Sequence, residues 1–397
     1  MRFPLLAFIA LIIFNGLIDL YIVRAVWKRC TERPRLWRSV ALGTSIALAL
    51  FLTTIFLWPK KSTGDAQLTA LMTCLYSYMA VYAGKITFIA LDLIGKIPRL
   101  FRRKAIRHTW IVAAVTGTAV TASMFYGMSV TRNTIQVKTI ELSYPTLPEA
   151  FDGLIIAQIS DIHTGSYAGD TTHLCRMADS IAAHNPDIIL FTGDIVNRHS
   201  SELTPFTRIL SSLSAPLGVY SVMGNHDYGD YMNWPDHSRR RRDARRLKAM
   251  QAGMGWTMLN DSTAWLRAGN DSIALIGVEN IGEPPFRTYG SLARAYTKPL
   301  SDSNFKILLS HNPKHWTDSI IGRPEANIAL TLSGHTHAMQ LEIGSWSPSQ
   351  YIYPTWGGIY GDENRKLYVN IGIGTVGMPA RIGATPEITI ITLNKSR

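Results

Sequence analysis

The chain has 397 residues, of which 47% are hydrophobic and only 17% are charged. This length exceeds that of one ordinary domain, and the low share of charged residues argues against a purely soluble enzyme. The formal net charge is +12. Such an excess is weak evidence for nucleic-acid binding, because basic residues also orient membrane proteins and attract anionic lipid headgroups.

Four apolar stretches occupy the first third of the chain, at residues 3–23, 37–58, 68–94 and 110–128. Each has close to the roughly 20 residues that a helix needs to cross a bilayer, so we predict a transmembrane domain over residues 1–128. A cleaved signal peptide is the alternative for the first stretch, but Asn15 and Asp19 interrupt it and no small-residue cleavage motif follows. Lys85 of the third stretch is expected to pair with Asp19, either for function or to fix the helix register.

Basic residues concentrate in the first and third loops between these stretches. They are Arg24, Lys28, Arg29, Arg33, Arg35 and Arg38, and then Lys96, Arg99, Arg102, Arg103, Lys104 and Arg107. The second loop holds only Lys60 and Lys61. The positive-inside rule then makes the two basic loops cytoplasmic and turns the following domain outward. We therefore expect a multi-pass protein of a bacterial inner membrane with its large domain on the periplasmic or outer side.

Residues 129–153 are expected to form a connector with an early strand near 134–142, and residues 154–397 a second domain. Strand-like runs there alternate with helical patterns, at first over 154–160, 187–192 and 217–223 with helices near 171–184 and 203–213. Further strands are expected near 256–259, 272–278, 305–310, 328–333, 339–343, 367–373 and 387–393. Because each sheet must bury an apolar face, these strands predict an α/β fold of two packed mixed sheets flanked by helices.

Five of the strand-like runs end beside residue types that bind metals. The segments are Asp161-Ile162-His163, Gly193-Asp194, Gly224-Asn225-His226-Asp227, Ser310-His311 and Gly334-His335-Thr336-His337. In open α/β sheets, ligand sites lie beyond the carboxyl ends of the strands. The five runs therefore predict one metal site with more than one cation. Asp194 is the candidate bridge, because a carboxylate with two oxygens can join cations about 3.5–4 Å apart.

This ordered set resembles the calcineurin-like metallophosphoesterase superfamily, and the closing stretch from Leu367 resembles its membrane-associated subgroup. The resemblance implies a four-layer sandwich fold and a metal-dependent phosphoric ester hydrolase. It implies two ligand sets, which are Asp161, His163, Asp194 and His337 for one metal and Asp194, Asn225, His311 and His335 for the other. It leaves His226 free to act on the phosphoryl group or leaving group, with Asp227 orienting its ring.

The chemistry of these ligands narrows the cofactor and the nucleophile. Mixed imidazole, carboxylate and amide ligation suits two divalent ions of Mn, Fe or Zn. The expected nucleophile is a metal-activated water, because coordination lowers the pKa of water.

The resemblance of the closing stretch to the membrane-associated subgroup makes Arg381 a candidate substrate contact, with a structural ion pair as the alternative. The aromatic-rich segment 344–366 is expected either to dip into the membrane interface or to form a small core of its own.

Together these features predict a membrane-anchored phosphoesterase that hydrolyses a phosphodiester, pyrophosphate or phosphomonoester of a lipid or cell-envelope glycan. Its expected partners are membrane lipids. Nucleic acid is not expected, because no aromatic residue interleaves the arginine cluster at 239–248. Three alternatives stay open: an outward-facing nucleotide phosphodiesterase, a UDP-diacylglucosamine-type pyrophosphatase if the domain is cytoplasmic, and a non-catalytic membrane sensor. The full ligand set and His226 favour an enzyme over a sensor.

Overall fold

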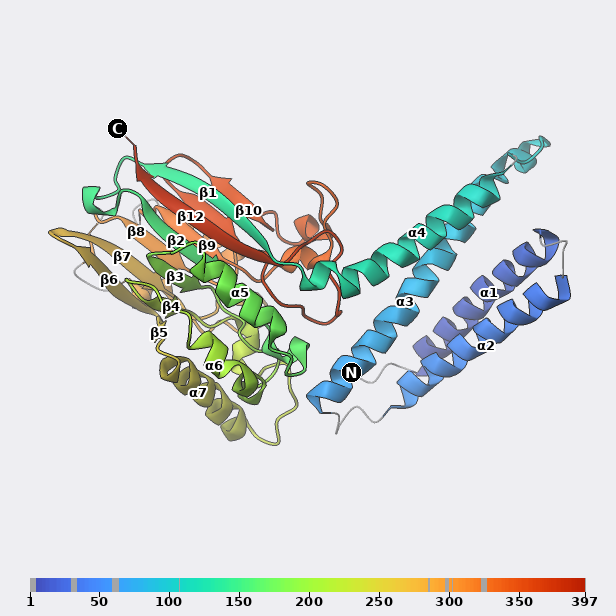
Figure 1. Ribbon diagram of the computed structural model, residues 1–397, viewed down its shortest axis with the longest axis horizontal. Helices are drawn as coiled ribbons and strands as arrows, with labels where there is room; N and C mark the ends of the chain where they lie inside the picture. Colours follow the sequence, from blue (N-terminus) through green and yellow to red (C-terminus); the bar gives the residue numbers. More distant parts are fainter. Residues whose placement is uncertain are drawn as a thin grey trace. The chain divides into compact units, whose positions relative to one another are not determined.

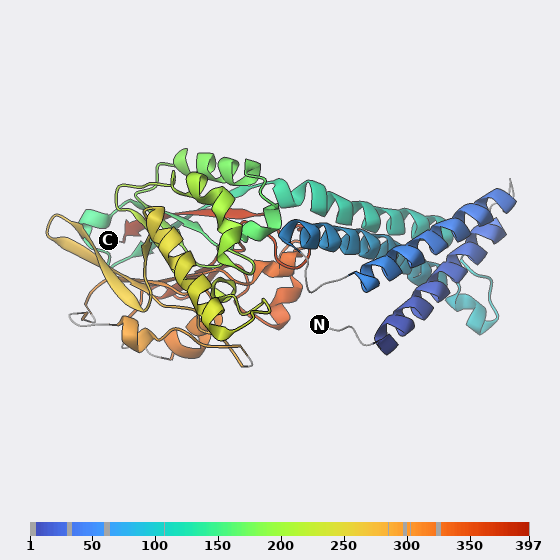
Figure 2. The same cartoon turned by 90° about the horizontal axis from the view of Figure 1, so that it is seen from below.

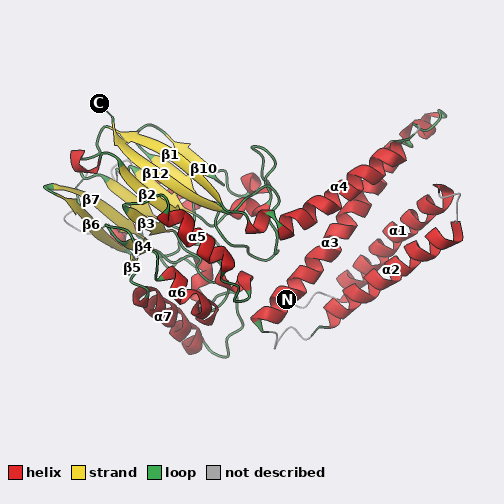
Figure 3. Cartoon of the chain, viewed as in Figure 1, coloured by secondary structure: helices red, strands yellow, loops and turns green. Residues whose placement is uncertain are grey.

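The computed structural model describes residues 5–29, 34–58, 64–106, 108–284, 286–296, 300–301, 303–322 and 327–396. The chain divides into two compact units, Met1–Met128 and Ser129–Arg397. The described part of the first unit is helical, whereas all the described strands belong to the second (Figure 3).

The first unit contains four long apolar helices, α1 (Leu5–Arg29), α2 (Pro34–Leu57), α3 (Asp65–Ile94) and α4 (Thr109–Ser129), labelled in Figure 1. All four are long and apolar enough to cross a membrane. The helices expected from the sequence over 37–58, 68–94 and 110–128 correspond to α2, α3 and α4. Phe3, where the first helix was expected to begin, lies outside the described residues, as do Lys60 and Lys61 of the second loop.

Polar contacts join the helices of this unit. The Lys85 ammonium lies 2.5 Å from an Asp19 carboxylate oxygen, which confirms the expected pairing of α3 with α1. The Tyr82 hydroxyl donates to the other Asp19 oxygen at 2.7 Å. On another side of α3, Gly84 and the α4 residue Gly117 allow a close approach, because a Cβ atom on Gly117 would lie 2.6 Å from the Gly84 carbonyl oxygen.

The second unit is built on two six-stranded mixed sheets (Figure 1). In order across the first sheet, the strands are β1 (Gln136–Tyr144), β12 (Glu387–Lys395), β2 (Leu154–Ile159), β3 (Ile188–Phe191), β4 (Val219–Ser221) and β5 (Thr257–Met258). The second sheet contains β10 (Gly358–Gly361), β11 (Lys366–Val369), β9 (Leu330–Ser333), β8 (Lys306–Leu309), β7 (Asp271–Gly277) and β6 (Ser262–Ala268). Strands β2 to β5 run parallel, and β12 is antiparallel to β2.

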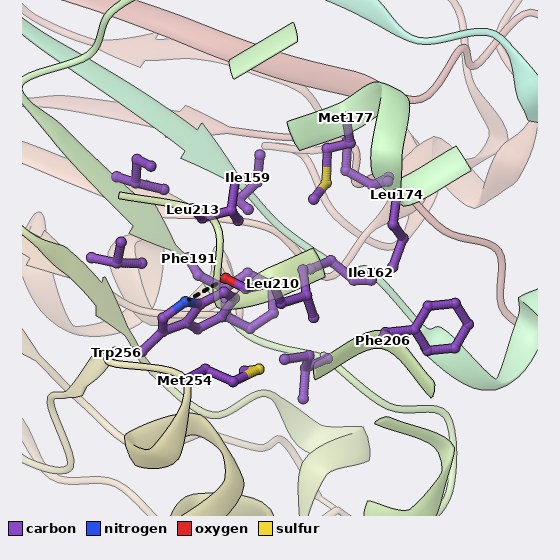
Figure 4. Packing of buried hydrophobic residues seen from close by; sticks show 14 of the residues in the cluster. Ile159, Ile162, Leu174, Met177, Phe191, Phe206, Leu210, Leu213, Met254 and Trp256 are labelled. Carbon is purple, nitrogen blue, oxygen red and sulfur yellow. Dashed lines mark hydrogen bonds between the residues drawn. The ribbon is translucent and has the colours of Figure 1, made fainter. Parts of the chain in front are cut away.

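The sheets pack face to face over an apolar core that includes Ile156, Leu190, Leu275 and Leu332, which come from β2, β3, β7 and β9 (Figures 1 and 2). The other face of the first sheet is covered by α5 (Thr172–Ala182), α6 (Thr207–Leu210) and α7 (His237–Gly253). Figure 4 shows this packing around Trp256, whose indole N–H donates to the Leu210 carbonyl oxygen at 3.2 Å. The expected fold class of two mixed sheets flanked by helices is confirmed.

The structure differs from the sequence analysis at several elements. Strands β6 and β10 were not expected. The strand expected over 339–343 is instead a helical turn, His337–Gln340, followed by two isolated bridges, one between Leu341 and Ile382 and one between Ile343 and Trp346. Its cause is local, since Ala338 and Met339 have left-handed φ angles of 52° and 46°, which no strand adopts. Strand β1, expected in the connector, pairs along all of its length with β12 and so belongs to the first sheet.

Candidate metal centre

The seven expected metal ligands come together at the carboxyl ends of the central strands. Asp161 follows β2, Asp194 follows β3, His311 follows β8 and His335 follows β9. Backbone hydrogen bonds tie these strand ends in pairs, since the Asp161 N–H donates to the Gly193 carbonyl at 2.9 Å and the Gly334 N–H donates to the His311 carbonyl at 2.9 Å. The parallel strands of both sheets therefore deliver polar side chains to one place.

The first group of potential ligands consists of Asp161, His163 and His337, whose ligand atoms all lie within 4.8 Å of one another. His337 Nε2 is 3.2 Å from Asp161 Oδ1 and 3.0 Å from His163 Nε2. All three side chains are buried. This is the spacing of donor atoms that share one cation.

The second group consists of Asp194, His311 and His335, which also lie within 4.8 Å of one another. His311 Nε2 is 3.1 Å from Asp194 Oδ2, 3.1 Å from Asn225 Oδ1 and 3.2 Å from His335 Nδ1. Asn225 thus brings its amide oxygen into the same group.

Asp194 lies between the two groups. Its Oδ2 atom is 3.1 Å from His311 Nε2 in the second group and 3.7 Å from His163 Nε2 in the first. Its Oδ1 atom accepts the His226 backbone N–H at 2.8 Å, which fixes the carboxylate. One carboxylate facing both groups is the arrangement that a bridging ligand requires.

Backbone carbonyls orient the imidazoles. His163 Nδ1 lies 3.2 Å from the Val196 carbonyl oxygen, and His311 Nδ1 lies 2.8 Å from that of Thr192. A carbonyl can only accept, so both Nδ1 atoms carry a proton and both Nε2 atoms face the centre. His335 has the opposite arrangement, because its Nε2 meets the Tyr353 hydroxyl at 2.9 Å and its Nδ1 faces the centre.

The backbone around the centre is strained. Five of the residues, namely Asp161, His163, Asp194, His335 and His337, have φ angles between 48° and 77°, a region that side chains other than glycine adopt infrequently. Such strain persists where the surrounding structure imposes it, and it is common at functional sites. Gly193 shows how close the packing is, because a Cβ atom there would lie 2.8 Å from His311 Nδ1.

The electrostatics of the centre favour a cation. Although burial opposes the charged form, the Asp194 carboxylate raises the pKa of His311 to about 9. Asp161 Oδ1 is buried and has no hydrogen-bond partner among the described residues, which is costly for a carboxylate oxygen that nothing coordinates. A field that draws a proton onto a buried imidazole also stabilises metal cations. The donor set of carboxylates, imidazoles and an amide oxygen therefore suits two divalent metal ions.

A cavity of about 410 Å³ opens over the centre. Its wall includes Asp194, Asn225, His226, Tyr231, His335, Thr336, His337, Met339, Gln340, Tyr353, Val376, Gly377 and Met378. The His226 ring stacks on Tyr231 with 4.2 Å between the ring centroids, and its Nδ1 donates to the Asn197 carbonyl oxygen at 2.7 Å. His226 therefore presents its Nε2 atom to the cavity. The ligand atoms of His226 and the first-group residue His163 also lie within 4.8 Å of Asp194.

Asp227 does not orient the His226 ring, contrary to the expectation from the sequence. Its two buried carboxylate oxygens accept the backbone N–H groups of Asp194 at 2.9 Å, of Gly224 at 2.9 Å and of Ile195 at 2.9 Å, with Val196 at 3.3 Å. No hydrogen bond joins Asp227 to the His226 ring within the described part of the chain. Asp227 instead holds the strained turn that presents Asp194, and the Asn197 carbonyl orients His226.

Arg381 is not a substrate contact in this structure. Its side chain is completely buried, and its guanidinium donates to the carbonyl oxygens of Ile371, Gly374 and Ala384 at 2.6–3.1 Å. It also lies 3.0 Å from His337 Nδ1. It makes no ion pair among the described residues either, so neither expectation from the sequence is correct. A buried guanidinium needs several hydrogen-bond acceptors, and these backbone carbonyls supply them. Arg381 therefore fixes the loop behind His337.

Two tyrosines of the centre had no assigned role in the sequence analysis. Tyr353 orients His335, and the Tyr231 hydroxyl accepts from the Asn225 amide at 2.8 Å. Tyr353 belongs to the aromatic-rich segment noted above, but its spacing from the metal motifs carries no signal. Tyr231 follows Asn225 by six residues, and this proximity in sequence is the one signal that could have indicated its contact with the Asn225 amide.

Comparison with known proteins agrees with this geometry. The model of the calcineurin-like phosphoesterase family matches residues 154–339, and the model of a probable calcineurin-like phosphoesterase transmembrane domain matches residues 1–132. The Bacillus subtilis metallophosphoesterase YkuE is 30% identical over 298 residues, which cover 71% of this chain and 94% of that protein. A transmembrane protein with metallophosphoesterase domain from Danio rerio is 28% identical over 418 residues, which cover 100% of this chain and 90% of the relative.

A third relative is named for a defined reaction. The UDP-2,3-diacylglucosamine pyrophosphatase LpxG of Chlamydia muridarum is 26% identical over 293 residues, which cover 62% of this chain and 86% of the relative. The motifs, the two sheets and both family matches lead to the same conclusion. The chain belongs to the calcineurin-like phosphoesterases, a family of hydrolases, and is a membrane protein with four apolar N-terminal helices.

Proposed function

We propose that the protein hydrolyses a phosphate ester held at the membrane, using water and two divalent cations at the centre described above. The observation that carries this proposal is the position of the Asp194 carboxylate, between two groups of buried ligands and on the wall of an open cavity. When bound, the cations would lower the pKa of a water molecule and neutralise phosphate charge.

The proposed metal ligands fall into two sets. Asp161, His163 and His337 would hold one cation, Asn225, His311 and His335 would hold the other, and Asp194 would belong to both sets. The buried imidazoles and carboxylates suit Mn, Fe or Zn, and Mn is our first choice for reconstitution. The close backbone packing and the carbonyl contacts of the histidines keep these donors in place before a cation arrives.

His226 is the proposed catalytic residue. Its Nδ1 proton is committed to the Asn197 carbonyl, so its Nε2 atom is the one that faces the cavity. From there it stabilises charge on the phosphoryl oxygens or gives a proton to the leaving group when it is protonated. The stacked Tyr231 ring limits its rotation.

We propose a lipid or cell-envelope glycan as the carrier of the phosphate. Anchoring supports this, because confinement to a membrane raises the effective concentration of a substrate in the same membrane. The named activity of the Chlamydia muridarum relative on a diacylated nucleotide sugar is a pyrophosphate cleavage of this kind. A phosphodiester or pyrophosphate is therefore the preferred bond, with a phosphomonoester as the further possibility to test.

The proposed location of the enzymatic unit is the periplasmic or outer side of a bacterial inner membrane. The support is the charge of the loops, since the segments around Arg24–Arg38 and Lys96–Arg107 are rich in basic residues, whereas the loop between the second and third helices holds only Lys60 and Lys61. A reporter enzyme fused after Arg397 tests this directly. Activity of a periplasmic reporter is expected, and activity of a cytoplasmic reporter would reverse the orientation and favour a nucleotide-sugar pyrophosphatase.

Catalysis is tested with the full-length protein purified in detergent and supplied with Mn²⁺. We expect turnover of bis-p-nitrophenyl phosphate that EDTA abolishes and added Mn²⁺ restores. Asp194→Asn should lose both bound metal and turnover, because the bridging position loses its charge. The matched control is Asp179→Asn, the same chemical change on an exposed residue of α5, which should keep both. Turnover that survives Asp194→Asn would refute the proposed centre.

A further inference from the structure

One side of the cavity mouth is apolar and exposed. We define the rim as residues 339–352 together with residues 376–378. Its exposed side chains and their exposed fractions are Met339 at 43%, Ile343 at 65%, Trp346 at 38%, Tyr351 at 76%, Ile352 at 53% and Met378 at 46%. From Ile343 to Gly361 the chain contains no charged residue. Exposed apolar side chains that gather into a patch mark an interaction site in soluble domains.

The rim is held in shape by hydrogen bonds and is continuous with the cavity. Its two segments are joined through Gln340, whose amide donates to the Met378 carbonyl at 3.0 Å and accepts the Val376 N–H at 2.8 Å. Within the first segment the Ile343 N–H donates to the Trp346 carbonyl at 2.8 Å. Met339, Gln340 and Met378 also line the cavity over the metal centre. Met339 and Met378 therefore stand at the entrance to the site, and the other exposed apolar side chains of the rim belong to the same segment as Met339.

The chain enters the second unit beside this rim. Helix α4 ends at Ser129 and β1 begins at Gln136, so no more than roughly 25 Å of extended chain separates them. Within that short link, the Arg132 guanidinium donates to the carbonyl oxygens of Ser166 at 2.7 Å and Pro379 at 3.5 Å. Pro379 follows Met378 directly. The link from the last apolar helix is thus fastened to the loop that forms part of the rim.

We propose that the rim docks into the interfacial layer of the membrane that anchors the protein, and that the cavity takes its phosphate group from an amphiphile in that layer. The occupant is a bilayer because the short link keeps the rim within reach of the membrane surface. Trp346 and Tyr351 are the residue types that settle at such an interface, with an apolar ring and a polar edge. Glu342 is the one charged residue in the sequence of the rim, and no charged residue follows it from Ile343 to Gly361, so few ionised groups approach the acyl chains.

This inference rests on the proposed function for its substrate, but its geometry is tested separately. Full-length protein in nanodiscs of phosphatidylcholine and phosphatidylglycerol would carry a nitroxide label at Tyr351→Cys, with Cys30, Cys74 and Cys175 replaced by serine. Spin-label relaxation by oxygen and by a water-soluble nickel chelate reports depth. The matched control is Asn270→Cys in the exposed turn between β6 and β7, at the opposite edge of the second sheet from β10.

We expect the label at position 351 to be reached by oxygen and shielded from nickel, and the label at 270 to be reached by nickel. Equal access of nickel to both labels would overturn the proposal. Shielding accompanied by dipolar broadening between labels would also overturn it, because a second copy of the chain would then cover the rim. Shielding that appears only on addition of a cell extract would assign the rim to a soluble partner and count against the bilayer.

A second measurement uses two synthetic diesters, bis-p-nitrophenyl phosphate in solution and hexadecyl p-nitrophenyl phosphate in the same lipid. Ile343→Asp should lower kcat/KM for the hexadecyl ester at least tenfold relative to that for the soluble ester, because a carboxylate resists entry into the interface. An unchanged ratio would refute the docking. Wild-type protein that turns over neither ester would contradict the proposed function while leaving the depth measurement interpretable.

Discussion

The replacement Asp227→Asn distinguishes two roles for the carboxylate beside His226. In the structure this carboxylate accepts four backbone N–H groups, two at each oxygen. An amide of the same size keeps one oxygen and turns the other acceptor into an NH₂ donor. Two buried N–H groups then face a donor and lose their partner. The turn that presents Asp194 should loosen as a result.

The size of the effect follows from these two lost partners. Leaving a buried donor unsatisfied costs about 1–3 kcal/mol, so the loss in unfolding free energy should be about 2–6 kcal/mol. For a unit of this size, 1 kcal/mol corresponds to roughly 2–4 °C in melting temperature. We therefore expect the second unit of Asp227→Asn to melt roughly 10 °C lower and to bind less metal.

The assay compares the variant with wild type in detergent at pH 8, by thermal melting and by metal content. Burial and the Asp194 carboxylate raise the pKa of Asp227 to about 7, so at pH 8 the wild-type carboxylate is largely ionised and accepts all four donors. His226→Asn is the matched control, because it changes the neighbouring residue without touching those N–H groups. An Asp227→Asn protein with wild-type melting and metal content but slow turnover would refute our reasoning and restore Asp227 as the partner of His226.

Three further outcomes follow from the described contacts. His226→Ala should keep both metals, by elemental analysis, while turnover of bis-p-nitrophenyl phosphate falls about 10²–10⁴-fold; loss of metal would make it a ligand. Arg381→Met should lower the unfolding free energy by about 3 kcal/mol through three orphaned carbonyls, with an unchanged KM; a raised KM would return it to the substrate site. Lys85→Met should lower the stability of the first unit by about 3 kcal/mol, because it leaves the buried Asp19 carboxylate without its ion-pair partner. The double variant Asp19→Asn/Lys85→Met should lose less stability, because no unpaired charge remains. Melting in detergent measures both, and equal losses would argue against coupling of the two residues.

The sequence was sufficient to predict two packed sheets and the potential ligands that gather at the ends of their strands. The predicted ligands stand where apolar strands end, and parallel strands must deliver their ends to one edge, so Asp161, Asp194, His311 and His335 could be grouped without coordinates. Strand β6 escaped prediction because Ser262–Ala268 mixes polar and apolar residues and is only half-buried at the sheet edge. Periodicity is weak in such a strand.

The roles of Asp227 and Arg381 were beyond the reach of the sequence for a different reason. Both side chains form hydrogen bonds with backbone groups. Every residue type except proline carries the same backbone N–H and carbonyl groups, so the sequence does not indicate which of them will be the partners. Three of the four N–H groups that Asp227 accepts are 31–33 residues away, and the Arg381 guanidinium donates to carbonyls whose positions depend on local loop shape. From the sequence, a polar residue beside a catalytic motif is most easily interpreted as a hydrogen-bond partner of the motif's side chains. Its actual partners can instead be backbone groups that hold the site in shape.

The position of β12 in the first sheet determines when that sheet can be completed during synthesis. Among the described strands β1 pairs with β12 alone, and β2 has β12 as its outer neighbour, so Glu387–Lys395 joins the first strand of the unit to the rest of its sheet. The ribosome, having synthesised the four apolar helices first, must release the chain as far as Lys395 before this seam closes. Until then β1 exposes an unsatisfied edge, and the nascent chain depends on chaperones for protection.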